Sequence, residues 1–535
     1  RRGRGPPMGL PVFRGGAAAG IAGAARNRLN TVFFHTVDDP LPLGAVPLSQ
    51  YERLRDGAVA LARQRGMTVE LGGHGMSALL PREMFSQMPG AFRYHDGQRT
   101  PDYNLCPSDP AALATLRRNA QAYFRAHPEA DVYHIWPDDL AEGGWCSCSQ
   151  CIAYTPSEQA LIATNAIAEA LEYVYPGAQL SFLAYHDTEA VPRRVKPRKN
   201  VALLWAPRMR CYAHPVNDPT CPVNSPHYSE AFRAQAAHFA DAAPPRVFEY
   251  YLDAVLFKSV LPPLPAVMQR DLRAYRAAGA HTVQALMTGD RPWLTPQVNA
   301  WLFARLAWDP EQDVDSLLAE FGASVFGLPE DEAEHDAAAL DLAMYYRSLE
   351  AAYALALDLV PEEINLQLSD DPLAVLHDPP ADMGDPFFAP PDVLAARAER
   401  EAVIAGLLEQ AAAHLGAIAA YAAPGPLEQE RVAFELHDAW LRFDLARVRL
   451  YSAAANGAGG VSERYREAKA ALQRVYDWGE TYLEDPRYLA NFQFIHALFW
   501  QLRLDKIHAE HAPGGPLGWL RRGPAALQVG LLLRR

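Results

Sequence analysis

Two adjacent carboxylates, Asp138 and Asp139, follow an apolar run that ends at Trp136, within the stretch HIWPDDLAEGGWCSCSQC (residues 134–151). Paired carboxylates can serve as acid and base in one reaction when their surroundings push their pKa values apart. Aspartate after proline in a loop also commonly caps a turn, which is the structural alternative. The pair is therefore a candidate for catalysis, with turn capping as the competing role.

A third carboxylate, Glu249, stands within the otherwise apolar and aromatic run VFEYYLDAVLF (residues 247–257). A carboxylate in such surroundings is costly to bury unless it has a partner or a chemical role. We predict Glu249 as a catalytic residue that faces Asp138 and Asp139 across a site. Two alternatives are a structural ion pair with an arginine and a functional role for Asp253, four residues further on.

Other polar and aromatic residues near the ends of predicted strands are candidates for binding the substrate. Aromatic faces of this kind stack on sugar rings, and the polar groups can contact hydroxyls; the alternatives are plain packing and ordinary structural hydrogen bonds. The predicted substrate-binding residues are His35, His74, Trp136, Tyr185, Glu189, Arg208, Tyr250 and Asp290.

Three of the six cysteines, Cys146, Cys148 and Cys151, follow the Asp pair in C-x-C-x2-C spacing. With Cys106 they are the predicted ligands of a structural zinc ion, although the usual zinc knuckle has C-x2-C spacing. Buried thiols or one local disulfide are the alternatives. We expect no cofactor to be required for catalysis, since the chain has no P-loop, dinucleotide-binding fingerprint or H-E-x-x-H motif.

These residues must be positioned by the elements around them. Short β-branched or aromatic runs alternate with amphipathic helical stretches up to about residue 290, as in a parallel α/β fold. The predicted strands are residues 30–35, 67–73, 131–136, 179–185, 200–206, 246–251 and 281–287. Because residues 15–30 are predicted to be helical, the first strand of an eight-stranded (β/α)8 TIM-type barrel would precede Arg1 or lie degraded in the first dozen residues. Barrel enzymes place their chemistry at the carboxyl ends of the strands.

After Trp293 the sequence becomes continuously helical and rich in alanine and leucine. It is interrupted by a loop rich in proline and aspartate, residues 369–392. We therefore predict a catalytic barrel over residues 1–305, an α-helical C-terminal domain over residues 306–510 and a tail over residues 511–535.

The 535 residues carry 49 basic and 63 acidic side chains, a net charge of −14. This balance argues against a nucleic-acid partner, which requires a basic face. No apolar run approaches the roughly 18 residues of a membrane span. The chain starts with Arg1 rather than Met, so we expect a fragment; the compartment, cytoplasmic or secreted, and the oligomeric state stay open.

Six stretches together resemble the bacterial domain of unknown function 4838, grouped as glycoside hydrolase family 163. The resemblance covers roughly residues 26–309 and is carried by GGHGMSALLPREMF, DGQRTPDYNLCPSDP, WPDDLAEGGWCSCSQC, LAYHDTEAVP, APRMRCYAHPVNDPTCPVN and EYYLDAVLF. It implies a (β/α)8 barrel with endo-β-N-acetylglucosaminidase activity on N-glycans. The hexosaminidase-like domain that often precedes such barrels is not visible in this sequence.

The expected activity is thus hydrolysis of a β-glycosidic bond in an amino-sugar-containing glycan. With a 2-acetamido sugar, one Asp of the pair would orient the acetamide as internal nucleophile while the other protonates the leaving oxygen. Otherwise Asp139 would be the acid and Glu249 the nucleophile or base. The alternatives are an exo-acting hexosaminidase, an α-glucuronidase-like barrel and a non-catalytic glycan-binding barrel.

Overall fold

A computed structural model describes residues 16–37, 46–288, 297–359 and 391–512, except residues 141–142, 222, 254–255, 258–259, 330, 423, 456–459, 484–485, 487–488, 490–491 and 494–499. Seven parallel strands form one sheet in the order β10-β9-β8-β7-β6-β3-β1, and the two-residue strand β2 pairs with the end of β1. The strands are β1 Thr31–Val37, β2 Val46–Pro47, β3 Thr68–Gly73, β6 Val132–Ile135, β7 Gln179–Ala184, β8 Val201–Trp205, β9 Ala243–Asp253 and β10 Thr282–Thr288. All seven predicted strands are confirmed.

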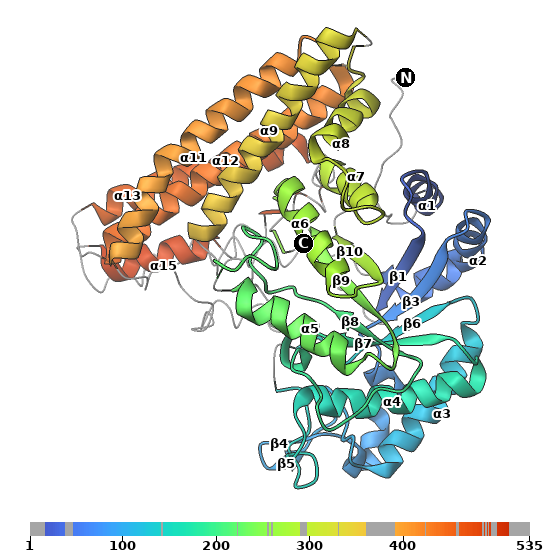
Figure 1. Cartoon of the computed structure of the whole chain (residues 1–535). Coiled ribbons are helices and arrows are strands. Elements are labelled where there is room, and N and C mark those ends of the chain that lie inside the picture. The colour runs from blue at the N-terminus through green and yellow to red at the C-terminus, as the bar shows by residue number, and fades with distance from the viewer. Residues whose placement is uncertain are drawn as a thin grey trace.

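One helix precedes β1, others connect most of the successive strands, and together they cover the outer face of the sheet (Figure 1). Their starts follow local sequence: the Asp109 carboxylate accepts hydrogen bonds from the first backbone N–H groups of α3, and Thr155 with Glu158 forms a capping box at the start of α4. These helices are α1 Gly16–Arg26, α2 Leu48–Gln64, α3 Pro110–Ala126, α4 Pro156–Val174, α5 Ser229–His238 and α6 Pro265–Ala277. A long excursion between β3 and α3 carries the hairpin of β4 Tyr94–His95 and β5 Gln98–Arg99.

The sheet is strongly curled. Arg246 of β9 donates to Glu70 of β3 over 2.7 Å, although three strands lie between β3 and β9. In a flat sheet these two strands would be about 19 Å apart, four steps of roughly 4.8 Å. Gln284 of β10 also donates to Glu70, so both ends of the sheet turn toward a shared interior. Between the described strands no pairing joins β10 to β1, and the predicted first strand falls outside the described residues.

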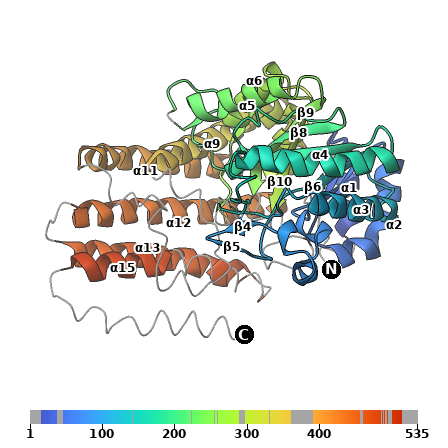
Figure 2. The same ribbon diagram turned by 90° about the horizontal axis from the view of Figure 1, so that it is seen from below.

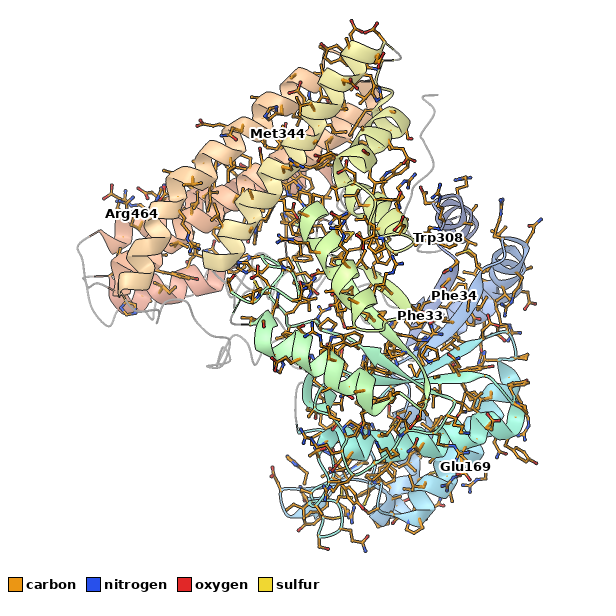
Figure 3. The ribbon with its side chains drawn as sticks, in the orientation of Figure 1. Phe33, Phe34, Glu169, Trp308, Met344 and Arg464 are labelled. Atoms are coloured by element: carbon orange, nitrogen blue, oxygen red, sulfur yellow. The ribbon has the colours of Figure 1, made fainter. Side chains whose placement is uncertain are left out.

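Neighbouring residues of β1 show the two faces of the sheet (Figure 3). Phe33 points into the concave interior, where its ring lies 5.8 Å from Trp136 and 6.0 Å from Phe248. Phe34 points the other way and packs on Tyr51 of α2 at 5.0 Å. The concave face is thus filled by side chains below the carboxyl ends of the strands, and the site must lie above this filling.

The helices that follow β10 are α7 Gln297–Leu306, α8 Val314–Phe321, α9 Glu332–Leu359, α11 Pro391–Ile418, α12 Pro424–Ala455, α13 Val461–Tyr482 and α15 Leu502–His511. The long ones among them, α9, α11, α12 and α13, lie side by side and extend away from the sheet (Figure 2). Their helical character matches the prediction, whereas their status as a separate domain stays a prediction. None of the described helices is long and apolar enough to cross a bilayer.

Glu350 ties α9 to the sheet-bearing part of the chain. Its nearly buried carboxylate accepts hydrogen bonds from the backbone N–H groups of Ala266 and Val267, at the first turn of α6. An anionic group at this position satisfies N–H groups that have no partner within the helix. The contact therefore fixes the start of α6 against the long helices.

Candidate functional site

Two glycines at the end of β3 allow the strands to approach closely where the site forms. Gly72 has φ +131°, and a Cβ atom there would lie 1.8 Å from the carbonyl oxygen of His134 on β6. Gly73 has φ +159°, and its Cβ would lie 2.6 Å from the carbonyl oxygen of Thr36 on β1. Only glycine fits both positions. The chain then turns and places His74 above the strand ends.

A buried polar chain forms the floor of the site. The Trp136 indole N–H donates to the Ser181 hydroxyl oxygen over 2.8 Å, and this hydroxyl lies 2.7 Å from His134 Nδ1. His134 Nε2 lies 2.9 Å from the Glu70 carboxylate. Burial lowers the pKa of His134, so the imidazole is neutral and carries its proton on Nε2, facing Glu70. These contacts hold the Trp136 ring in one orientation.

Four of the predicted substrate-binding residues converge above this floor, each from a different strand end. The ring of Trp136 lies 5.5 Å from that of His35 and 5.2 Å from that of His74. The His74 ring lies 6.4 Å from that of Tyr185, which follows β7. The sequence prediction that these side chains share one site agrees with this geometry.

Asp139 belongs to the same cluster; the residue reaches solvent, although protein atoms closely surround its carboxyl group. Burial alone would raise the pKa of this carboxyl. The opposing effect is larger and brings the pKa below its usual value; it comes from His74, His186, Arg208 and a hydrogen bond from Tyr185. The carboxylate is therefore ionised at neutral pH. An accessible anion among aromatic and imidazole rings is the chemically distinctive group of this site.

The imidazoles beside Asp139 have assignable states. Burial lowers the pKa of His35 to about 3 and that of His186 to about 4, so both rings are neutral. His74 Nδ1 lies 2.6 Å from the carbonyl oxygen of Pro137, and a carbonyl can only accept. His74 therefore carries a proton on Nδ1, which leaves Nε2 to act as acceptor or, once protonated, as donor.

His186 and Asp253 are two members of the site that the predicted residue set lacks. His186 follows Tyr185 directly and has φ +51°, a conformation that non-glycine residues adopt at a cost. Asp253, considered from sequence only as an alternative to Glu249, is fully buried and pairs with Arg208, whose guanidinium lies 5.0 Å from the Tyr250 ring. Both residues lie at or just after the end of a strand, and this position in the sequence could have identified them as members of the site.

Asp138 lies apart from its neighbour. Its carboxylate accepts from Arg82 over 3.1 Å, and its backbone N–H donates to the side-chain oxygen of Asn104 over 3.0 Å. These contacts fasten the loop to the excursion that precedes α3. The adjacent aspartates thus have different surroundings: Asp138 is held by an arginine, and Asp139 faces the imidazoles.

Glu249 does not lie with the Asp pair. On β9, Arg246 and Phe248 point into the concave interior, whereas Glu249 points to the opposite face. There it is completely buried and accepts hydrogen bonds from Arg210 at 3.1 Å, Tyr275 at 2.5 Å and Tyr212 at 3.3 Å. The prediction that Glu249 lies at the mouth of the site is wrong, because side chains alternate along a strand and that of Glu249 points outward. Its contacts are those of the alternative considered from sequence, a structural ion pair with an arginine.

Glu189 also points elsewhere, toward His227, with a carboxylate oxygen 3.1 Å from the ring nitrogen Nε2. This contact raises the pKa of His227. Asp290, the last of the predicted substrate contacts, lies outside the described residues.

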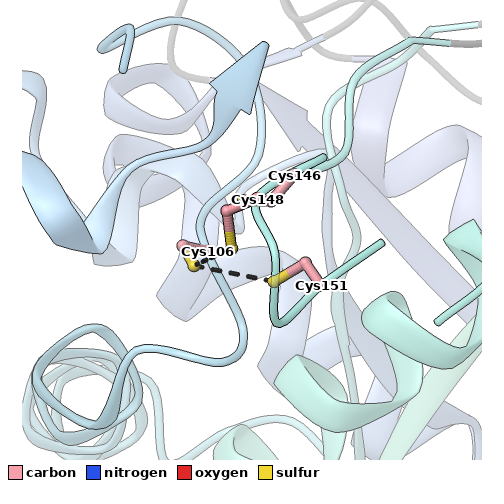
Figure 4. Close-up of side chains that lie close together, drawn as sticks. All are labelled: Cys106, Cys146, Cys148 and Cys151. Atoms are coloured by element: carbon pink, nitrogen blue, oxygen red, sulfur yellow. Dashed lines mark hydrogen bonds between the residues drawn. The ribbon is translucent and has the colours of Figure 1, made fainter. Parts of the chain in front are cut away.

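The four predicted metal ligands do come together (Figure 4). The sulfur atoms of Cys106, Cys146, Cys148 and Cys151 all lie within 4.8 Å of one another. Cys106 Sγ is 3.6 Å from that of Cys151 and 3.9 Å from that of Cys148. All four thiols are free. The local disulfide considered from sequence is therefore not formed.

The sequence profile of the family described as Domain of unknown function (DUF4838) matches residues 46–331. No curated protein matches the chain.

Proposed function

The chain belongs to the DUF4838 family, and on that premise we propose that it is a glycoside hydrolase that cleaves a β-glycosidic bond in an amino-sugar-containing glycan of the N-glycan type. One observation carries the proposal. Asp139, an ionised and accessible carboxylate, lies at the carboxyl ends of parallel strands among His74, His186 and Tyr185. This is the edge of the sheet at which such folds place their active sites.

The surroundings of Asp139 suit an uncharged sugar. Trp136 and Tyr185 offer aromatic surface, and neutral imidazoles such as His35 can both donate and accept hydrogen bonds, as hydroxyl groups require. Arg208, a cation that acts on Asp139, is paired with Asp253. A neutral glycan therefore fits the described groups better than an anionic one.

The ionised state of Asp139 indicates its role. A general acid must hold a proton, so Asp139 suits instead the anion that accepts the N–H of a 2-acetamido group, or that stabilises positive charge developing at the anomeric carbon. In the first case the acetamide oxygen attacks the anomeric carbon as the bond to the leaving oxygen breaks. Asp138 is held by Arg82, so we assign the transfer of a proton to the leaving oxygen to His74, through Nε2.

The test is incubation of the purified chain with reducing-end-labelled N-glycans, with chromatography of the products. The expected result is release of a labelled fragment that ends in N-acetylglucosamine, with Asp139→Asn lowering turnover by about 10²- to 10⁴-fold. Asp138→Asn should lose less, and Glu189→Gln, away from the cluster, should keep near-normal turnover. Release of single terminal sugars would favour exo action, and binding without cleavage of any glycan would contradict hydrolase function.

The same proposal includes a complete (β/α)8 barrel followed by an α-helical domain, with the closing strand between β10 and β1. The seven parallel strands and their curl support it. An experimental structure in which another strand pairs with both β1 and β10 is the expected outcome, and a sheet left open there would contradict it.

We also propose that Cys106, Cys146, Cys148 and Cys151 bind a structural zinc ion. Sulfurs that share a tetrahedral zinc ion at about 2.3 Å must lie roughly 3.8 Å from one another, and the separations of 3.6 and 3.9 Å agree with that value. Cys146 Sγ accepts a hydrogen bond from the Tyr94 backbone N–H and has Arg99 at 3.6 Å, both of which stabilise a thiolate. The ion would brace the loop that carries Asp138 and Asp139.

A further inference from the structure

A second group of metal-binding side chains lies in the segment between β8 and α5. The sulfurs of Cys211 and Cys221 and a ring nitrogen of His214 all lie within 4.8 Å of one another. The two thiols are free and buried, with 5% and 1% exposure. All six cysteines of the chain therefore belong to one of two clusters, four in the first and two in the second.

The spacing of the second cluster suits coordination. Cys211 Sγ lies 3.4 Å from His214 Nδ1. A thiolate at about 2.3 Å and an imidazole at about 2.0–2.1 Å from one tetrahedral zinc ion must be roughly 3.5 Å apart. The observed separation therefore requires almost no movement of either side chain to accept an ion.

Backbone N–H groups contact both cysteines of the second cluster. The N–H groups of Ala213 and His214 hydrogen-bond to Cys211, and the N–H of Asn224 donates to Cys221 Sγ over 3.4 Å.

Asn224 holds the ligand-bearing turn in shape. Its fully buried side chain donates to the carbonyl oxygens of Cys211 at 2.8 Å, His214 at 2.9 Å and Pro215 at 3.0 Å, and it accepts from the Cys211 N–H at 2.8 Å. The contacts of this one amide with four backbone groups pre-form the turn between two of the ligands. A binding site with ligands already in place loses little conformational entropy when the ion arrives.

We propose that Cys211, His214 and Cys221 bind a second divalent transition-metal ion, with zinc as the first candidate and water in the fourth position. Two soft thiolates and one imidazole are a ligand set typical of zinc. The turn immediately follows Arg208 and Arg210, which pair with Asp253 and Glu249 of β9. The ion would thus fix the segment that positions both arginines.

The experiment measures metal bound to the full chain, tag-free, expressed with zinc and purified under reducing conditions. The expected content is about two equivalents of zinc. Cys148→Ser should lose one, Cys221→Ser should lose the other, and His214→Gln should weaken the second without affecting the first. Circular dichroism of each variant shows that it is folded.

Cobalt substitution provides a second reading that does not depend on the Cys221→Ser variant folding. In the Cys148→Ser background, one bound cobalt ion should give a thiolate charge-transfer band about half as intense as that of a four-thiolate site, because two thiolates coordinate it instead of four. A wild-type chain whose only zinc is lost with Cys148→Ser would overturn the proposal. A Cys211–Cys221 disulfide, found by mass spectrometry of the chain as purified without oxidant, would overturn it as well.

Discussion

Arg210 Nε lies 3.1 Å from Glu249 Oε1, and solvent reaches neither side chain. The guanidinium also pairs with Asp271, so one buried cation serves two buried carboxylates, supported by hydroxyl groups from Tyr212, Tyr251 and Tyr275. A network of this kind connects β9 to α6 and to the segment after β8. Its first consequence is for stability rather than for chemistry.

Replacing Glu249 by leucine should lower the free energy of unfolding by about 3–5 kcal/mol, because the change removes one partner of a buried pair. The control is Glu169→Leu, which removes an exposed partner of Arg117 on the outer helices (Figure 3) and should cost at most about 1 kcal/mol. Urea denaturation of the two variants measures both losses of unfolding free energy. Equal losses would show that the network contributes no more than a surface pair. Folded Glu249→Leu that retains turnover would confirm that Glu249 is not part of the chemistry.

Glu350 predicts a pH dependence of stability. Burial raises its pKa from 4.5 to about 7, despite the N–H groups of Val267 and Ala266 that favour the anion. A carboxyl whose folded-state pKa is raised stabilises the fold below its unfolded pKa, and this contribution is lost as the pH rises through the folded value. Between pH 4 and pH 8 the loss should be on the order of 3 kcal/mol.

Glu350→Gln tests this by removing the titration while keeping an oxygen that can accept the same hydrogen bonds. Denaturation at pH 5 and at pH 8 should show the variant more stable than the wild-type chain at pH 8 and close to it at pH 5. If both proteins lose stability equally across this range, the pH dependence has another origin.

We expect Arg208 to influence the position of the acidic limb in the pH profile of kcat/KM. Arg208 is one of the three cationic or imidazole neighbours that lower the pKa of Asp139. Asp139 acts as an anion in the proposed mechanism, so activity is lost as the pH falls through its pKa. Arg208→Met should raise that pKa and move the limb upward by about one pH unit, whereas Arg82→Met, beside Asp138, should leave it in place. An unmoved limb in Arg208→Met would remove Asp139 from this role.

The backbone around Gly72 leaves no room for a side chain. Gly72→Ala places a Cβ atom 1.8 Å from a backbone oxygen of β6 at a positive φ, and neither strand can yield without breaking the ladder. We expect a loss of at least about 3 kcal/mol or failure to fold. At Gly75, two residues after Gly73, the nearest atom to an added Cβ is 4.0 Å away, so Gly75→Ala should change stability by less than about 1 kcal/mol. Thermal unfolding of both variants gives the comparison.

The sequence was sufficient to locate the strands but not to orient Glu249. The strand runs are recognisable because their β-branched and aromatic residues are bounded by turn and helix signals. A parallel strand is apolar on both faces, so the run VFEYY does not indicate whether Glu249 or its neighbours point inward. The different partners of Asp138 and Asp139 likewise depend on Arg82, which is 56 residues away from Asp138 in the chain. The C-x2-H-x6-C spacing of the second metal cluster was readable, but only its fold brings the three ligands together.

The contact between Glu70 and Arg246 also bears on how the protein is made. Arg246 is synthesised 176 residues after Glu70, which at about 5–20 residues per second corresponds to roughly 10–35 s on the ribosome. During that interval β6, β7 and β8 are synthesised, while the strand that extends the sheet beyond β8 and supplies the cation for Glu70 is still missing. Translation speed therefore determines how long the sheet stays incomplete and the Glu70 carboxylate lacks its arginine. Slower codons between the two residues should lower the yield of folded protein and increase its dependence on chaperones.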